Sequence, residues 1–149
     1  MWKKEYSAAL TKICVIIFMA AFVVCVAAGP WIIDSFVRFY RTDLLALKPW
    51  FALSAYSCAF PAGFALYHLY RLLIEIEHKN VFTLQNIRHL RILSWCCTAA
   101  AVICLASAFY YLPFLFVAIA AAFMALILRV IKNVFVEAHE IKSENDFTI

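Results

Sequence analysis

Histidines are the residues of this chain best suited to hold a haem or a metal ion, because imidazole ligates both. The sequence has four, at His68, His78, His89 and His139. A haem held between helices needs two histidines that face each other at the same depth. Only His68 falls within an apolar stretch, and no partner is evident at its depth. We therefore expect no haem, no metal ion and no other cofactor.

Six cysteines offer thiol chemistry, and two of them, Cys96 and Cys97, are adjacent. Membrane thiol oxidoreductases use two cysteines separated by two residues, a spacing that this chain lacks. A disulfide between neighbouring residues is strained, and small side chains that fill apolar space are a sufficient explanation for the pair. All six cysteines fall inside or beside apolar stretches, so we expect no disulfide framework.

No group of residues has the composition of an active site. A serine or cysteine nucleophile needs a base and a group that orients the base, and no such set is present. The chain has only two glycines, no glycine-rich phosphate loop and no basic–aromatic motif for nucleic acid. We expect no catalytic residues, no enzymatic activity and no direct binding of nucleic acid.

Transporters place ionisable side chains inside the membrane, where they are costly and therefore usually functional. The central parts of the apolar stretches contain no Asp, Glu, Lys or Arg. Small proton-coupled multidrug exporters depend on an acidic residue in their first helix, and residues 13–28 contain none. This argues against proton-coupled export. A small-molecule or lipid carrier, or a passive channel with its gate at Pro61, stays open as an alternative.

Charged residues outside the apolar stretches are the remaining candidates. Together with the apolar end of the chain they form the predicted partner-binding residues, here called the rim: Arg88, His89, Arg91, Glu137, Glu140, Asp146, Phe147 and Ile149. One interpretation is electrostatic, with Arg88 paired to Glu137 and other basic side chains reaching lipid phosphates. The other is a docking surface for a cytoplasmic protein. The two interpretations are compatible.

Composition identifies the elements that must carry these residues. Hydrophobic residues make up 67% of the chain and charged residues 15%, with a mean hydropathy of +0.90, unlike a soluble domain. A bilayer core of roughly 30 Å takes about 20 helical residues to cross. The 149 residues therefore predict one all-α integral membrane domain, a four-helix bundle with spans at about 7–28, 50–74, 92–112 and 113–136.

The placement of basic residues predicts the orientation of the bundle. Ten of the 13 Lys and Arg residues lie near the N-terminus, after the second span or after the fourth, against Arg38, Arg41 and Lys48 on the other side. Both termini are therefore expected in the cytoplasm, with the protein in the inner membrane. The net charge of +4 fits attraction to anionic lipid.

Prolines are expected to shape the first two helices. The first span should stop at Gly29-Pro30, and residues 31–48 should then form an amphipathic segment on the outer surface. Within that segment, Asp34 and Arg38 have the spacing of a helical ion pair. Pro61 should kink the second helix near the middle of the membrane.

A capping motif predicts the start of the third helix. Thr83 is a suitable N-cap, and Phe82 and Ile87 occupy the two positions of a hydrophobic staple. The helix would then enter the membrane at Trp95. A short link at Tyr110–Pro113 makes the third and fourth spans an antiparallel hairpin, which would place Arg88 and Glu137 at the same height, and the fourth helix would continue beyond the membrane.

Two patches of sequence resemble a known family. The first is Val81-Phe82-Thr83 with Asn86, Leu90-Arg91 and Ser94-Trp95, and the second is the ending Glu-Asn-Asp-Phe-Thr-Ile at 144–149. Both resemble the YoaS-like family of small four-helix bacterial membrane proteins, a domain of unknown function. This chain departs from the family pattern at Leu84-Gln85, where acidic residues often stand, and at Phe147, where leucine is usual.

The resemblance implies a cytoplasmic-membrane protein of a kind often encoded beside a small helix-turn-helix regulator, and it supplies no catalytic residues. We therefore expect a membrane anchor or sensor that docks a cytoplasmic DNA-binding regulator. Besides the carrier or channel, an accessory subunit of a larger transporter is an alternative. It would leave small residues open to a second copy or another membrane protein: Ala118, Ala121, Ala122 and Ala125.

Overall fold

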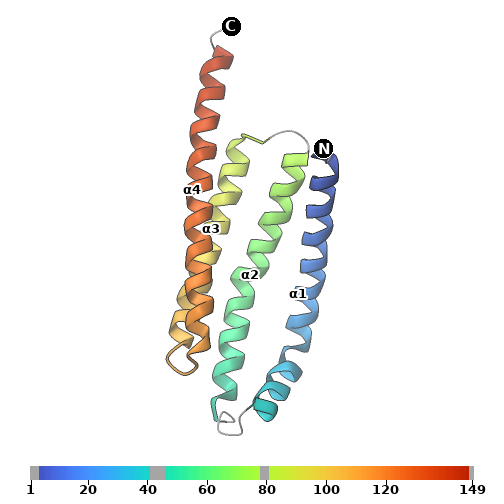
Figure 1. Cartoon of the computed structure of the whole chain (residues 1–149), viewed down its shortest axis with the longest axis vertical. Coiled ribbons are helices and arrows are strands. Elements are labelled where there is room, and N and C mark those ends of the chain that lie inside the picture. Colours follow the sequence, from blue (N-terminus) through green and yellow to red (C-terminus); the bar gives the residue numbers. More distant parts are fainter. Residues whose placement is uncertain (1–3, 41–45, 78–80, 148–149) are drawn as a thin grey trace.

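The chain forms four long antiparallel helices in the computed structural model, which describes residues 4–40, 46–77 and 81–147. The helices are α1 (Lys4–Tyr40), α2 (Lys48–Glu77), α3 (Leu84–Ser107) and α4 (Pro113–Phe147). The all-α prediction is confirmed. Figure 1 shows α2 standing between α1 on one side and the α3–α4 hairpin on the other.

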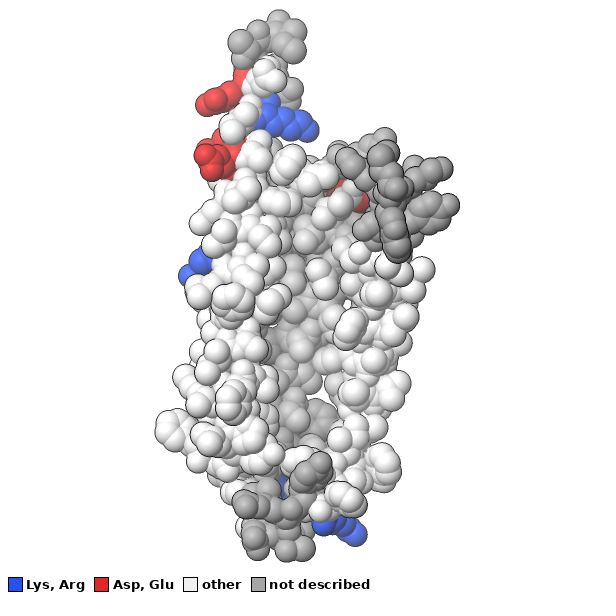
Figure 2. Space-filling model, viewed as in Figure 1, with Lys and Arg blue, Asp and Glu red and all other residues white. Residues whose placement is uncertain are grey.

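The helices are arranged as a row. Across the described ranges, backbone contacts join α1 to α2, α2 to α3 and α3 to α4, and no other pair of helices. A closed bundle would also bring α1 against α4. Figure 2 shows the consequence, a face that is hollowed along its length between the sides formed by α4 and α1.

Three of the helices are long and apolar enough to cross a membrane. The candidate spans are Leu10–Phe39, Leu84–Ser107 and Pro113–Asn145. Large apolar side chains along them are exposed, among them Phe18 and Phe123. In Figure 2 most charged side chains lie near the two ends, one basic group lies on the left flank, and a wide uncharged band extends below it to the lower end. Such a surface indicates a membrane protein, because a lipid environment favours exposed apolar side chains.

The second helix is not among the candidate spans, although a span was predicted at about 50–74. Its serines, tyrosines and Pro61 lower its hydropathy relative to the other three helices. It packs on both α1 and α3, and so lies alongside two helices that are themselves candidate spans. Pro61 is buried within α2, and the helix continues through it.

The first helix does not end at Gly29-Pro30. The prediction of a break followed by a separate segment at 31–48 is wrong, because α1 continues beyond both residues. A proline lacks the N–H that would bond to the carbonyl four residues earlier, here that of Val26. The Tyr56 hydroxyl of α2 donates to this oxygen instead, at 3.4 Å. Figure 1 shows the far end of α1 turned from the direction of the rest of the helix.

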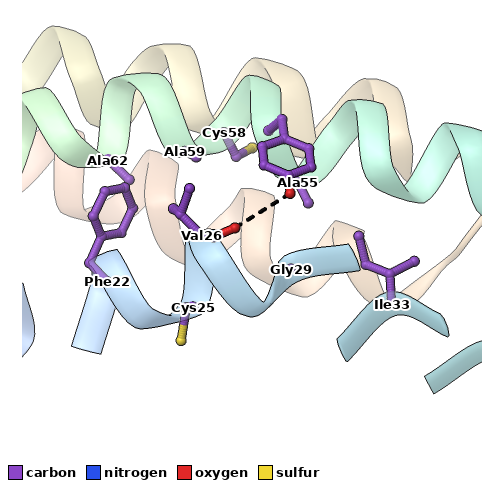
Figure 3. A pocket seen from close by; sticks show the side chains of 10 residues that line it. Phe22, Cys25, Val26, Gly29, Ile33, Ala55, Cys58, Ala59 and Ala62 are labelled. Carbon is purple, nitrogen blue, oxygen red and sulfur yellow. Dashed lines mark hydrogen bonds between the residues drawn. The ribbon is translucent and has the colours of Figure 1, made fainter. Parts of the chain in front are cut away.

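The two glycines of the chain lie where α1 meets α2. A Cβ atom at Gly29 would lie 3.0 Å from the Tyr56 hydroxyl, and one at Gly63 would lie 3.2 Å from the Phe22 ring. Each glycine therefore allows an aromatic side chain of the facing helix to approach its backbone closely. Figure 3 shows Phe22 reaching from α1 towards Ala62 of α2, and its dashed line marks the hydrogen bond to the Val26 carbonyl.

The third helix ends earlier than predicted, at Ser107 rather than at residue 112. The turn between α3 and α4 is therefore centred nearer to α3 than predicted. As a result, residues of the two helices that were predicted to lie at the same height do not do so. Ser94 lies against α4 where its Oγ donates to the Ala125 carbonyl at 2.9 Å. Within the described residues no ion pair joins Arg88 to Glu137, so the predicted pairing is wrong.

Candidate docking site

The segment before α3 is held in place by local hydrogen bonds. As predicted, Thr83 is the N-cap, and its hydroxyl oxygen accepts a hydrogen bond from the backbone N–H of Asn86 at 3.3 Å. The Asn86 side chain donates to the Val81 carbonyl at 2.8 Å. Ile87 is buried, while the ring of Phe82 packs against Phe135 of α4 with 5.3 Å between ring centroids.

The end of α4 projects beyond the rest of the molecule. Its 35 residues give a length of about 52 Å, well above the roughly 30 Å of a hydrocarbon core. Figure 1 shows the last turns of α4 standing clear of the other three helices. At the base of this projection, Nδ1–H of His139 donates to the Phe82 carbonyl at 2.9 Å. The fourth helix therefore continues past its predicted span, which ends at about residue 136.

A hollow of about 640 Å³ lies between the start of α3 and the projecting part of α4. We call it the docking hollow, and its lining residues are Phe82, Thr83, Leu84, Gln85, His139, Lys142 and Ser143. Two of the apolar side chains that line it are exposed, Phe82 at 39% and Leu84 at 69%. Ile141 on the projection, which is not part of the lining, is 62% exposed. The hollow thus combines exposed apolar surface with polar groups from two helices.

The structure places the predicted rim residues in different environments. Arg88 and Arg91 are exposed on α3, and Glu137 and Glu140 are exposed on α4. The helix α4 reaches as far as Phe147. The side chains of Asp146 and Phe147, and the whole of Ile149, lie outside the described residues.

His89 was predicted to belong to the partner-binding rim, but it is buried and is not available to a partner. Its side chain is 8% exposed, and its Nδ1 lies 2.8 Å from Nδ1 of His68 in α2. One imidazole must donate its Nδ1–H, and the other must accept with the lone pair of its Nδ1. The accepting Nδ1 therefore carries no proton, and that ring is neutral. The pair adjoins the core cluster of Leu72, Leu90 and Leu93.

The expectation that His68 has no partner at its depth is also wrong. The helices α2 and α3 form a second antiparallel hairpin, in which His68 lies nine residues before the end of α2 and His89 five residues after the start of α3. Because these steps from the turn are unequal, counting along the sequence does not pair the two residues. No group of three or more His, Cys, Asp or Glu side chains that could hold a metal occurs in the described part of the chain.

A comparison with protein families shows to which family the chain belongs. Residues 3–149 match the family described as a protein of unknown function, DUF2975. The chain belongs to this family. No curated protein and no solved structure matches it. The DUF2975 match covers all four helices, including the patch that begins at Val81, of which Phe82 and Thr83 line the docking hollow.

Two further polar sites lie elsewhere in this DUF2975 domain. Trp95 is 60% exposed on α3, and the guanidinium carbon of Arg129 lies 5.8 Å from the centre of its ring. At the opposite end, the Ser54 hydroxyl lies 2.6 Å from that of Ser107 and accepts a hydrogen bond from Tyr110 at 2.6 Å. The second site joins residues of α2, of α3 and of the turn before α4. Sequence reasoning missed it because these segments meet only in the folded chain.

Proposed function

We propose that this chain is an inner-membrane protein that docks a small cytoplasmic helix-turn-helix regulator through the docking hollow and the projecting end of α4. The observation that carries the proposal is the projection itself, because it holds the exposed apolar side chain of Ile141 clear of the other three helices. An exposed apolar surface outside a membrane is typical of a protein-interaction site. The nature of the partner rests on the resemblance to the YoaS-like family.

The same proposal assigns a membrane topology. All four helices cross the bilayer, α2 included, because α2 is packed alongside α1 and α3 and runs antiparallel to both. Both termini are then cytoplasmic, and the docking hollow faces the cytoplasm. The Lys12–Glu77 ion pair, at 2.7 Å, would lie on this side, and Asp34 with Arg38, at 2.9 Å, on the outer side.

The chemistry of the docking hollow suits a helical partner. Phe82 and Leu84 supply apolar contacts, and Gln85, Lys142 and Ser143 supply hydrogen bonds around them. A short amphipathic helix could place its apolar side against such a surface. Arg88 and Glu140, both exposed nearby, would add charge complementarity at the edge.

An affinity pull-down from native membranes tests the proposal. The intact chain is compared with Leu84→Asp/Ile141→Asp and with a deletion of residues 142–149, and recovered proteins are identified by mass spectrometry. Recovery of a helix-turn-helix protein with the intact chain, and its loss with both variants, is the expected result. Phe109→Asp is the matched control, since Phe109 is 96% exposed at the opposite end and its change should leave recovery intact.

Two outcomes would reject the proposal. If no helix-turn-helix protein accompanies the intact chain, the docking function is wrong. If the regulator is recovered equally with Leu84→Asp/Ile141→Asp, the docking hollow is not its binding surface. Labelling of single cysteines at the projection with an impermeant maleimide on intact cells tests the topology separately, and labelling from outside would overturn it.

A carrier of small apolar molecules is a second candidate, because a hollow of about 550 Å³ lies between α2 and α3. Its lining includes Ser54, Ser57 and Tyr110, among mostly apolar neighbours. By contrast, the accessory-subunit alternative receives less support. Ala118 and Ala125 are 4% and 6% exposed, so much of the predicted small-residue face is already covered.

A further inference from the structure

A second hollow, of about 330 Å³, lies on the α3–α4 hairpin away from the docking hollow. We call it the basic hollow. Its lining residues are Arg91, Ser94 and Trp95 of α3 and Arg129, Lys132 and Asn133 of α4. Three of these six side chains are cationic, and none is acidic. The basic hollow therefore concentrates positive charge from two helices in one place.

The cations of the basic hollow lack acidic partners. Across the described ranges, the ion pairs join Lys12 to Glu77 and Asp34 to Arg38 and Lys48, and none includes Arg91, Arg129 or Lys132. Like charges held close together repel one another. Arg129 gains some compensation from the Trp95 ring, 5.8 Å from its guanidinium carbon. An anion bound between the cations would remove the remaining repulsion.

The position of the basic hollow on the helices indicates which anion it receives. From Pro113 to Arg129, α4 rises about 24 Å along a predominantly apolar stretch. Exposed apolar side chains line this stretch up to the edge of the hollow, among them Leu126 and Val130 at 60% and 62% exposed. The hollow thus lies where the first charged side chains of α4, Arg129 and Lys132, interrupt its apolar surface, as expected at the level of lipid phosphates. Trp95, an aromatic side chain favoured at that level, marks the same height.

We propose that the basic hollow binds the headgroup phosphate of an anionic glycerophospholipid. Arg91, Arg129 and Lys132 surround the phosphate, and Asn133 can donate a hydrogen bond to the headgroup from its amide. The acyl chains lie along the exposed apolar surface of α3 and α4. A zwitterionic lipid fits less well, because its own ammonium group would adjoin three cations. The proposal depends on membrane insertion and not on a docked regulator.

Native mass spectrometry of the full-length protein in a neutral detergent tests the proposal, with phosphatidylglycerol as the anionic probe and phosphatidylcholine as the zwitterionic one. Phosphatidylglycerol should bind more tightly. Arg129→Gln/Lys132→Gln should weaken its binding by about 25-fold, at about fivefold for each cation. The matched control is Arg88→Gln/Lys142→Gln, which removes the same charge from the same two helices outside the basic hollow and should change binding by less than about twofold.

Three results would overturn the proposal: equal binding of both lipids, an equal loss in the control variant, or displacement of the lipid by soluble glycerol phosphate at similar concentration. The last result would identify a soluble phosphate as the ligand. A fluorescence measurement on the unchanged protein and on a single variant, Trp95→Phe, covers the case in which the double variant does not fold. Brominated phosphatidylglycerol should quench more fluorescence than brominated phosphatidylcholine, and Trp95→Phe should abolish that difference; a difference that persists would place the lipid elsewhere.

Discussion

The buried pair of His68 and His89 makes a quantitative prediction about stability. When one partner of a buried hydrogen bond is removed, the other loses its bond without regaining water, at a cost of about 1–3 kcal/mol. Removal of both partners leaves no orphaned group. His68→Leu and His89→Leu should therefore each lower the free energy of unfolding, while the double variant should be more stable than the sum of the two losses predicts.

The structure also predicts which of the two single substitutions lowers the free energy of unfolding more. Nε2 of His89 is buried and has no hydrogen-bond partner within the described residues. His68→Leu would leave His89 with two buried nitrogens unbonded, whereas His89→Leu removes the nitrogen that is already unbonded. We expect His68→Leu to be the more destabilising by about 1 kcal/mol. The coupling energy between the two sites should be about 0.5–1.5 kcal/mol, as for bonded pairs within membrane proteins.

Reversible unfolding by titration of SDS into mixed micelles, followed by circular dichroism, measures all four proteins. Two results would refute the reasoning. Strictly additive losses would mean that the bond at 2.8 Å contributes nothing to stability. A larger loss for His89→Leu than for His68→Leu would show that the unbonded Nε2 carries no cost in the native protein.

Three other substitutions test single contacts by the same titration. Tyr56→Phe removes the donor to the Val26 carbonyl and should cost about 1 kcal/mol; unchanged stability would mean that this carbonyl needs no donor. Gly63→Val should separate α1 from α2, because its Cβ would lie 3.2 Å from the Phe22 ring, and Phe22→Ala in the same chain should restore part of the loss; no restoration would place the strain elsewhere. Thr83→Ala should cost about 1 kcal/mol and speed amide exchange in the first turn of α3, whereas Thr83→Ser should preserve both; equal effects of the two would contradict a capping role.

Much of the secondary structure could be predicted from local sequence. The N-cap at Thr83 was predicted and is present, and α4 is a helix well past its predicted span at 113–136. Asp34 and Arg38, predicted to pair at helical spacing, form an ion pair at 2.9 Å. These features depend on neighbours within a few residues, so the order of residues alone is sufficient to specify them.

The errors arose where a contact between helices decides the outcome. Gly29-Pro30 is a strong local signal for a helix end, but a hydroxyl from the facing helix satisfies the Val26 carbonyl that Pro30 leaves without a donor. The burial of His89 likewise depends on its partner in α2. Neither partner is near in sequence, so local reasoning could not weigh its contribution.

Composition and periodicity were sufficient to indicate an all-helical membrane protein, because hydropathy and helix length depend on each segment by itself. The arrangement of the helices as a row, the His68–His89 pair and the convergence of three cations on the basic hollow depend on the tertiary structure. The register between helices follows from where each turn is centred and how side chains fill the space between backbones. A shift of a few residues in one turn changes every partner along the hairpin, and only the packed structure decides which shift occurs.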